Sequence, residues 1–422
     1  MQVQQKLPPA LWRLLALLTV SVVVNYIDRG NLSTAAPLLK DELGLTTSQL
    51  GILLSSFFWA YAGFMVLAGW LADRLDVNWV LAVGFFTWCA ATVGTGFAHG
   101  FAALLIARLA LGMGESVSWP CYCTLLARHF PEHRRGMANA AIAIGMGIGP
   151  AVGMFTGGIL MARFGWRSVF ISLGLGGLLW LPAWLKWMPT AQAPALLETR
   201  ETTPGILEIV KQRSAWGTFL GCYSQGYLWY LLLTWIPFYL VRERHFSMDK
   251  MAEITGAAYL CTTVFTTVSG WLSDRWIASG GSPTLVRKTF VGVGQTCSGI
   301  CLLLCSVTRP AVSVVCLLLA FSFYGFYVAH VWAITQTLAG PRAAGQWFGV
   351  QNFFGSVAGI LAPAVTGFIV SRTESFFWPF AITASVAVLG SFCWVFVVGS
   401  VKQVVWTQPK ASDLLRVAAK TA

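Results

Sequence analysis

Two hexapeptides, Gly69-Trp-Leu-Ala-Asp-Arg74 and Gly270-Trp-Leu-Ser-Asp-Arg275, agree at five of their six positions. Each closes an apolar stretch long enough to cross a bilayer, which needs about 20 residues. Their glycines allow helices to approach closely, and an Asp-Arg pair can clasp the end of a neighbouring helix. The repeat therefore predicts two related halves with a conformational gate in each. The expected gate residues are Gly69, Asp73, Arg74, Gly270, Asp274 and Arg275.

The composition is that of a membrane protein. Hydrophobic residues make up 56% of the 422 residues and charged residues only 10%, whereas a soluble domain carries about 25% charged residues. The net charge of +12 does not indicate a nucleic-acid partner, because the basic residues fall in short loops between apolar stretches. The first apolar stretch starts near Leu11 and exceeds the roughly 7–15 residues of a signal-peptide core. We expect a multi-pass protein in a lipid bilayer.

Twelve spans are predicted when the chain is divided by the length that a bilayer requires. They lie near residues 12–36, 47–72, 78–98, 101–126, 136–162, 167–187, 214–240, 252–276, 286–307, 311–338, 345–371 and 376–400. The most polar stretch, Met188 to Arg213, predicts a linker with one short surface helix after Pro204. The expected domains are an N-terminal six-helix bundle (1–187), a cytoplasmic linker (188–213) and a C-terminal six-helix bundle with a short tail (214–422).

The distribution of basic residues predicts the orientation. If both termini are cytoplasmic, eighteen of the 28 Lys and Arg residues fall in cytoplasmic segments and eight in outer segments. The remaining two, Arg29 and Arg108, lie inside spans. Positive residues are enriched on the cytoplasmic side of membrane proteins. The expected fold is thus an all-α membrane protein with twelve transmembrane helices in two pseudo-symmetric bundles and both ends inside the cell.

Four ionisable residues interrupt the predicted spans: Asp28, Arg29, Arg108 and Glu115. A charge at the bilayer centre costs roughly 2.5–3.5 kcal/mol on insertion scales, so such residues usually mark a polar pathway. Arg108 and Glu115 lie on nearly the same helix face, about 10 Å apart along the axis. Counting along the first span gives Asp28 a depth like that of Arg108, which predicts an Asp28–Arg108 ion pair and leaves Arg29 for a ligand. The alternative is a buried ion network that only fixes helix packing.

From Leu11 to Val401 the chain resembles the major facilitator superfamily. The resemblance rests on the twelve spans, the central linker and both hexapeptides, together with Arg128-His-Phe-Pro-Glu-His-Arg-Arg-Gly136 and Gly165-Trp-Arg-Ser-Val-Phe170. It implies an alternating-access transporter with two six-helix halves around a central cavity.

Two further motifs resemble the anion:cation symporter family within that superfamily. They are Asn25-Tyr-Ile-Asp-Arg-Gly-Asn-Leu-Ser-Thr-Ala-Ala-Pro37 and Arg108-Leu-Ala-Leu-Gly-Met-Gly-Glu115-Ser-Val-Ser-Trp-Pro120. This family includes bacterial galactonate, hexuronate and glucarate transporters as well as vertebrate sialin. The resemblance implies that Arg29 binds the substrate carboxylate, that Asp28 and Glu115 carry protons, and that Arg108 pairs with these acids.

Charge balance links an anion to a proton. The four buried charges sum to zero, so a monoanion adds an unbalanced negative charge that protonation of one carboxylate removes. Burial penalises the charged form of a carboxyl group, and Glu115 is the expected first proton carrier. We therefore expect symport with one or two protons as the coupling ion, and neither a metal nor another cofactor.

Uncharged residues near these positions are the expected substrate contacts. Tyr26 lies within one turn of Asp28, and Tyr61 lies in the second span, although aromatic residues in spans usually serve packing. Asn352 and Ser356 share one face of the eleventh span and offer hydrogen bonds to a sugar.

Histidine and cysteine residues add less to the functional hypothesis. His330 in the tenth span is either a second proton site or a hydrogen-bonded structural residue, and we prefer the structural interpretation; the role of Trp332 close to it is open. Cys297, Cys301 and Cys305 share an apolar helix face, which indicates packing rather than a metal or disulfide framework.

Two features bear on the direction and the charge of the transported molecule. The seventh span carries no arginine, which by resemblance argues against a dianionic or phosphate substrate. The fifth span carries Gly145, Gly149, Pro150 and Gly153, close to a motif of antiporter-type facilitators. Tight helix packing by small residues is the preferred explanation.

The leading hypothesis is a monomeric, proton-coupled importer of a small monocarboxylate, such as a sugar acid, in the bacterial inner membrane. The alternatives are a proton-driven efflux antiporter of the same fold and a non-transporting nutrient sensor. Aromatic carboxylates stay open as substrates because of Trp59, Trp119, Tyr122 and the tyrosines of the seventh span. No nucleophile motif or metal-spaced histidine cluster indicates an enzyme.

Overall fold

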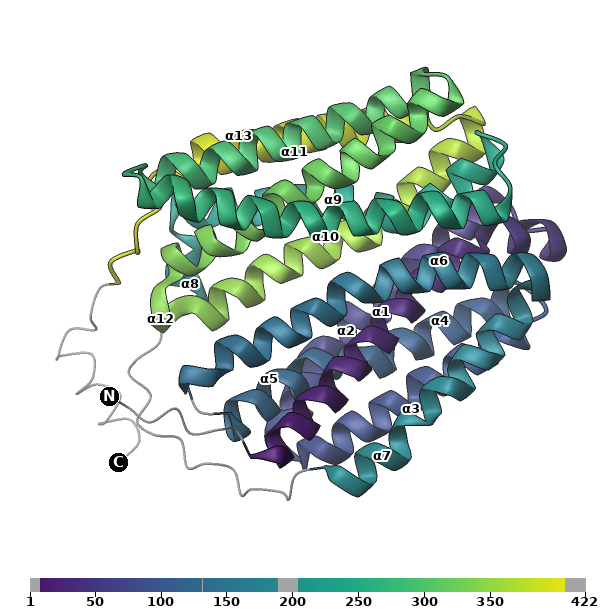
Figure 1. Cartoon of the computed structure of the whole chain (residues 1–422), viewed down its shortest axis with the longest axis horizontal. Helices are drawn as coiled ribbons and strands as arrows, with labels where there is room; N and C mark the ends of the chain where they lie inside the picture. The colour runs from purple at the N-terminus through teal and green to yellow at the C-terminus, as the bar shows by residue number, and fades with distance from the viewer. Residues whose placement is uncertain (1–7, 131, 189–203, 407–422) are drawn as a thin grey trace.

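Helices dominate the computed structural model, which describes residues 8–130, 132–188 and 204–406 (Figure 1). In chain order they are α1 (Pro9–Leu43), α2 (Thr47–Arg74), α3 (Val77–Gly96), α4 (Phe101–Ser116), α5 (Ser118–His129), α6 (Glu132–Leu178), α7 (Trp180–Trp187), α8 (Ile206–Val210), α9 (Arg213–Arg242), α10 (Met248–Ala278), α11 (Pro283–Val307), α12 (Pro310–Thr373), α13 (Phe377–Phe392) and the π-helix η1 (Cys393–Val397). The described ranges contain no strand.

All twelve predicted spans are helical. The two longest helices each hold two spans and break at a glycine with positive φ, Gly165 (φ 76°) in α6 and Gly340 (φ 62°) in α12. Residues with a side chain rarely adopt this backbone conformation, whereas glycine adopts it freely. The short helix predicted after Pro204 is confirmed as α8. Most of the predicted linker (189–203), Pro131 and the tail beyond residue 406 lie outside the described residues, and the bundle boundaries stay predictions.

Eight helical segments among the described residues are long and apolar enough to cross a membrane. One of them, Ile144–Trp187, covers most of the predicted span 136–162 and all of the span 167–187. The spans predicted at 47–72, 214–240 and 252–276 are not among these eight segments. Their helices α2, α9 and α10 have membrane length but pack across the molecule against α12, α1 and α6. Helix surfaces that face protein instead of lipid do not need a fully apolar composition.

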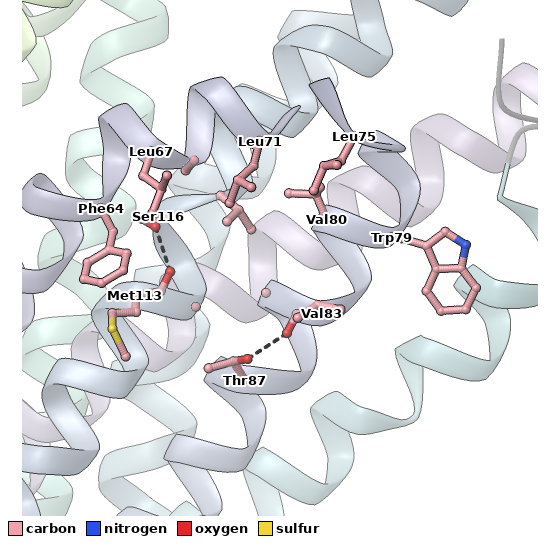
Figure 2. A pocket seen from close by; sticks show the side chains of 14 residues that line it. Phe64, Leu67, Leu71, Leu75, Trp79, Val80, Val83, Thr87, Met113 and Ser116 are labelled. Carbon is pink, nitrogen blue, oxygen red and sulfur yellow. Dashed lines mark hydrogen bonds between the residues drawn. The ribbon is translucent and has the colours of Figure 1, made fainter. Parts of the chain in front are cut away.

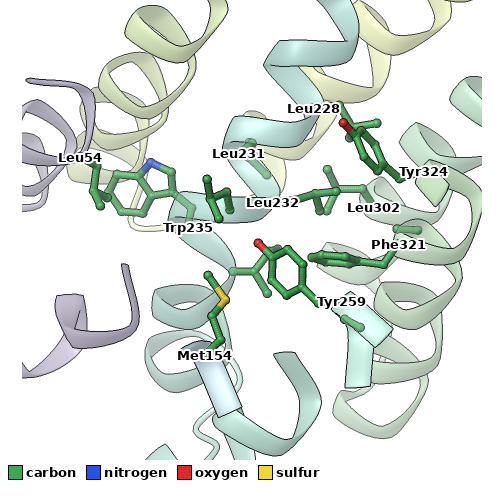
Figure 3. Packing of buried hydrophobic residues seen from close by; sticks show 14 of the residues in the cluster. Leu54, Met154, Leu228, Leu231, Leu232, Trp235, Tyr259, Leu302, Phe321 and Tyr324 are labelled. Atoms are coloured by element: carbon green, nitrogen blue, oxygen red, sulfur yellow. The ribbon is translucent and has the colours of Figure 1, made fainter. Parts of the chain in front are cut away.

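The helices form two groups, α1–α7 and α9–α13, which lie side by side (Figure 1). One core cluster crosses between them. Leu54 of α2 and Met154 of α6 belong to the same buried cluster as Trp235 of α9 and Tyr259 of α10 (Figure 3).

Contacts between the two groups gather at the end predicted to lie outside the cell. Ser48 donates to Ser371 at 2.7 Å, and Arg242 forms an ion pair with Asp41. In the same region, α2 and α12 approach most closely at Gly51 and Gly367. These contacts hold the outer ends of the two helix groups together.

The gate hexapeptides lie at the opposite end, where their described side chains form no ion pair between the two groups. A Cβ atom on Gly69 or Gly270 would meet nothing within 4 Å. The guanidinium groups of Arg74 and Arg275 lie over tryptophans of their own hexapeptides, at 5.4 and 4.8 Å from the ring centroids. No ion pair in the described part of the chain includes Arg74, Asp274 or Arg275, and the side chain of Asp73 lies outside that part. The side chains of residues 132–137 and 341–342 also lie outside the described part of the chain, so the clasp expected from these motifs stays a prediction.

Candidate functional site

The four charges inside the spans come from two helices and are buried. Asp28 and Arg29 lie in α1, and Arg108 and Glu115 lie in α4. Asp28 is 3%, Arg108 4% and Glu115 0% exposed. Glu115 lies one residue before the end of α4, and Val117 separates this helix from α5. This places a carboxylate at an interruption of the fourth span.

An ion pair joins the two helices. Arg29 Nε donates to Glu115 Oε2 at 2.8 Å, and the two side chains are 9% and 0% exposed. The second oxygen of the carboxylate, Oε1, and the terminal Nη2 of the guanidinium have no hydrogen-bond partner among the described residues. Each member of the pair thus keeps one buried polar atom that a ligand can engage.

The predicted Asp28–Arg108 pair is wrong for this conformation. No ion pair among the described residues joins them. Asp28 accepts a hydrogen bond from Asn31 Nδ2 on its own helix at 3.2 Å, and Arg108 Nε donates to the carbonyl oxygen of Leu53 at 3.3 Å. Counting residues along a helix gives the height of a residue, but it does not give the direction in which its side chain leaves the helix.

Three aromatic rings surround the Arg29 guanidinium. Its Cζ atom lies 4.9 Å from the ring centroid of Tyr26, 4.7 Å from that of Tyr61 and 5.3 Å from that of Phe57. A cation over a ring face is stabilised by about 0.5–2 kcal/mol. Two of these residues, Tyr26 and Tyr61, are among the sequence-predicted contacts. Phe57 is not, although Arg108 Cζ also lies 5.0 Å from its ring.

The second helix group adds an aromatic and uncharged wall, of which the sequence analysis named only the tyrosines of the seventh span. Tyr230 of α9 packs on Phe58 of α2 with ring centroids 4.4 Å apart. Trp229, the preceding residue of α9, stacks on Tyr324 with ring centroids 4.9 Å apart, and the Tyr324 hydroxyl accepts from Gln225 Nε2 at 3.4 Å. Their only sequence signal is the aromatic content of the seventh span, which packing explains equally well.

Asn352 and Ser356 do not join the charged cluster. Asn352 is exposed, and its Nδ2 points to Met65 Sδ of α2 at 3.8 Å. Ser356 is buried at 6% exposure. No hydrogen bond that the structure gives for either side chain reaches Asp28, Arg29 or Glu115. Asn352 lies at the contact between the two groups, so a substrate role stays a prediction.

His330 is packed rather than paired. It is 4% exposed, its ring lies 4.5 Å from that of Phe290, and its Nε2 has no hydrogen-bond partner within the described ranges. The packing agrees with a structural residue, whereas the expected hydrogen bond at Nε2 is not found. Trp332 stacks on Phe348 with centroids 5.6 Å apart, which is also a packing contact.

The glycines of the fifth span position the first span. A Cβ atom on Gly149 would lie 2.6 Å from Tyr26 Cβ, and one on Gly153 would lie 3.0 Å from Ile27 Cα. The small residues therefore let α6 and α1 approach at the height of the Arg29 site. This contact supports the packing explanation of the motif.

Known proteins resemble the chain over nearly its whole length. The family model described as Major Facilitator Superfamily matches residues 18–363. A probable sulfoacetate transporter of Cupriavidus necator is 32% identical over 91% of this chain and 93% of its own length. The hexuronate transporter of Bacillus subtilis is 31% identical over 92% and 93%. A bacterial homologue of the human lysosomal transporter Spinster, solved in an inward-facing and occupied conformation, has a TM-score of 0.82 at 17% identity and covers 96% of this chain and 100% of its own.

Proposed function

We propose that this chain, which belongs to the Major Facilitator Superfamily, is a proton-coupled symporter that imports a small organic monocarboxylate. The relatives named above are transporters and not enzymes. A sugar acid is the preferred substrate, because the hexuronate transporter of Bacillus subtilis is 31% identical over 92% of this chain. The proposed location is the bacterial inner membrane, the proposed working unit is a monomer, and protons are the only coupling ion.

The observation that carries this proposal is the buried Arg29–Glu115 ion pair. A substrate carboxylate that binds Arg29 competes with Glu115 for the same guanidinium. If the anion displaced an ionised Glu115, a buried carboxylate would lose its partner, and breaking a buried pair in this way costs about 3–5 kcal/mol. Protonation of Glu115 removes this cost.

Proton and anion therefore bind together. The proton neutralises Glu115, and the guanidinium is released to accept the substrate carboxylate. Nη2 of Arg29, which has no partner within the described part of the chain, then completes a two-pronged contact with the carboxylate. The site keeps its net charge through this exchange. Asp28, buried with Asn31 as its side-chain partner, is the proposed second proton carrier if the stoichiometry is two.

The remaining walls of the site fit a polyhydroxylated acid. Tyr26 and Tyr61 beside Arg29 and the Gln225–Tyr324 pair supply hydroxyl and amide groups, and Trp229 and the rings that flank it supply apolar faces. Sites for small molecules typically combine such apolar walls with a few polar groups that fix orientation.

Uptake by proteoliposomes tests the proposal. With the outside at pH 6 and the inside at pH 7.5, labelled hexuronate should accumulate above its outside concentration, and a protonophore should abolish this accumulation. Glu115→Gln should lose accumulation but keep exchange of labelled for unlabelled substrate, because glutamine imitates the protonated, uncharged form of Glu115. Glu253→Gln, an exposed glutamate beside Lys250, is the matched control and should behave like the unaltered protein.

Three results would contradict the proposal. Accumulation that survives in Glu115→Gln would remove the proton role of this residue. Extrusion of substrate under an inward proton gradient would favour the antiporter alternative. Binding of hexuronate without any flux would favour the sensor alternative.

A further inference from the structure

An apolar cavity of about 430 Å³ lies away from the charged site, between α2, α3 and the junction of α4 with α5 (Figure 2). Leu67, Leu71 and Leu75 line it from α2, four residues apart and thus on one helix face. Val80, Val83 and Thr87 line it from one face of α3. The residues that line it from the α4–α5 junction are Met113, Gly114, Ser116 and Val117. The volume falls in the range of about 300–1,000 Å³ that ligand pockets occupy.

The wall of this cavity offers hydrocarbon and no free polar group. The two side-chain hydroxyls in it bond to their own helices, Thr87 Oγ1 to the carbonyl of Val83 at 2.8 Å and Ser116 Oγ to the carbonyl of Met113 at 2.7 Å (Figure 2). None of the lining residues has a buried side-chain nitrogen or oxygen without a partner. A ligand here gains by burying apolar surface, at about 0.8 kcal/mol for each CH₂ group.

One end of the cavity lies where α2 ends and α3 begins, at the membrane boundary. Leu75 and Trp79 line this end and are each 53% exposed. Tryptophan is typical of the interface between lipid and water. The cavity runs from this boundary toward Thr87 and Met113, along the α3 span, so its long direction follows the acyl chains of a lipid leaflet.

An exposed cation, Arg74, lies beside the opening, with its guanidinium 5.4 Å from the ring centroid of Trp70. Arg74 precedes Leu75 directly, is exposed, and belongs to no ion pair found among the described residues. The nearby carboxylate of Asp76 is engaged in capping α3, where it accepts from the backbone N–H of Asn78 at 2.9 Å. A guanidinium at the mouth of an apolar groove matches a phosphate attached to a hydrocarbon chain.

We propose that this cavity binds one acyl chain of a membrane phospholipid, with the lipid phosphate at Arg74. The chain end lies against Met113, Gly114 and Ser116, the residues that flank Glu115, while Glu115 itself does not line the cavity. An occupied cavity supports the α4–α5 junction from the lipid side, next to the residue on which the proposed proton coupling depends. The lipid site does not depend on the identity of the transported substrate.

Photocrosslinking of the full chain in proteoliposomes tests the site. The probe is a phosphatidylglycerol with a diazirine in the middle of one acyl chain, and crosslinked peptides are mapped by mass spectrometry. We expect labelling of the Val83 and Met113 peptides. Val83→Trp fills the cavity and should lower this labelling at least about fivefold. Leu389 is an apolar residue of α13 that is 64% exposed, and the control variant Leu389→Trp should leave the labelling unchanged.

A second comparison tests the phosphate contact. Arg74→Gln should lower labelling by the phospholipid but not by a diacylglycerol that carries the same diazirine chain. Thr87→Phe fills the cavity from one turn further along the same face of α3 and replaces Val83→Trp if that variant does not fold. Labelling spread equally over the cavity and the α13 surface, or unaffected by a filled cavity, would overturn the acyl-chain site. Equal loss of both probes in Arg74→Gln would overturn the phosphate assignment.

Discussion

The contact between Gly51 and the facing helix predicts how one methyl group shifts the transport cycle. A Cβ atom on Gly51 would lie 2.9 Å from the carbonyl oxygen of Pro363 and 3.0 Å from Gly367 Cα. Both are backbone atoms, so neither can turn away. Gly51→Ala must therefore separate α2 from α12 at the end where the two helix groups now touch.

The size of the effect follows from this geometry. Real Cβ contacts fall at 3.4–4 Å, so the helices have to part by roughly half an ångström, and overpacking of this kind costs about 1–3 kcal/mol. Each 1.4 kcal/mol changes an equilibrium constant tenfold. The population ratio of other conformations to the one described here should therefore rise about 5- to 150-fold. A methyl on Gly63 of the same helix would meet nothing within 4 Å. Both changes gain the same helix propensity of about 1 kcal/mol, so Gly63→Ala is a matched control.

Electron–electron distance measurements give the readout. Spin labels at His99 in the N-terminal group and Thr373 in the C-terminal group, on a background without the ten native cysteines, report the separation of the outer ends. Gly51→Ala should enlarge the population with long distances, and Gly63→Ala should reproduce the parent distribution. If folded Gly51→Ala gave the parent distribution as well, the close approach of α2 and α12 would not decide which end is closed.

Three further predictions concern the site and its supports. Arg29→Lys keeps the charge but loses the planar fork, so hexuronate uptake at low concentration should fall at least about thirtyfold, and unchanged uptake would exclude a two-pronged contact. Gly149→Ala inserts a Cβ atom 2.6 Å from Tyr26 Cβ, so the free energy of unfolding should fall by about 1–3 kcal/mol in thermal or denaturant melts, and a neutral result would contradict the close approach. Asp41→Asn removes the ion pair with Arg242, whose side chains are 64% and 36% exposed, so stability should change by at most about 1 kcal/mol, and a larger loss would show that the pair is better shielded than its exposure indicates.

The fold could be predicted from sequence because its signals are local. The length of each apolar stretch fixes a span, and the hexapeptide repeat relates the two halves, so neither inference needs a distant contact. The same reasoning found all four buried charges, since the cost of a charge in a bilayer does not depend on its partner. The sequence did not show which end of the molecule is closed. Glycines such as Gly51 and Gly367 meet at that end although they are more than 300 residues apart in the sequence.

The partners of the buried charges were predicted wrongly, and the cause is geometric. Successive residues in a helix point about 100° apart, so Asp28 and Arg29 share a depth but face different neighbours. The rotation of α1, set by packing against the glycines of α6, turns Arg29 toward Glu115 and leaves Asp28 to Asn31. Phe57 was missed for a related reason, because an aromatic residue in a span has packing as its default role until a tertiary contact shows a cation beside it.

The corrected pairing changes the logic of coupling. If Arg108 neutralised Glu115, a substrate anion could bind Arg29 with no change at the carboxylate, and proton binding would be coupled only through long-range charge. Arg108 instead donates to the Leu53 carbonyl and lies over Phe57, and the ionic partner of Glu115 is Arg29 itself. Under the proposed mechanism, one guanidinium then serves either the internal carboxylate or the substrate carboxylate. Coupling follows from this exclusivity, and its strength is set by how poorly the buried Glu115 tolerates ionisation without a partner.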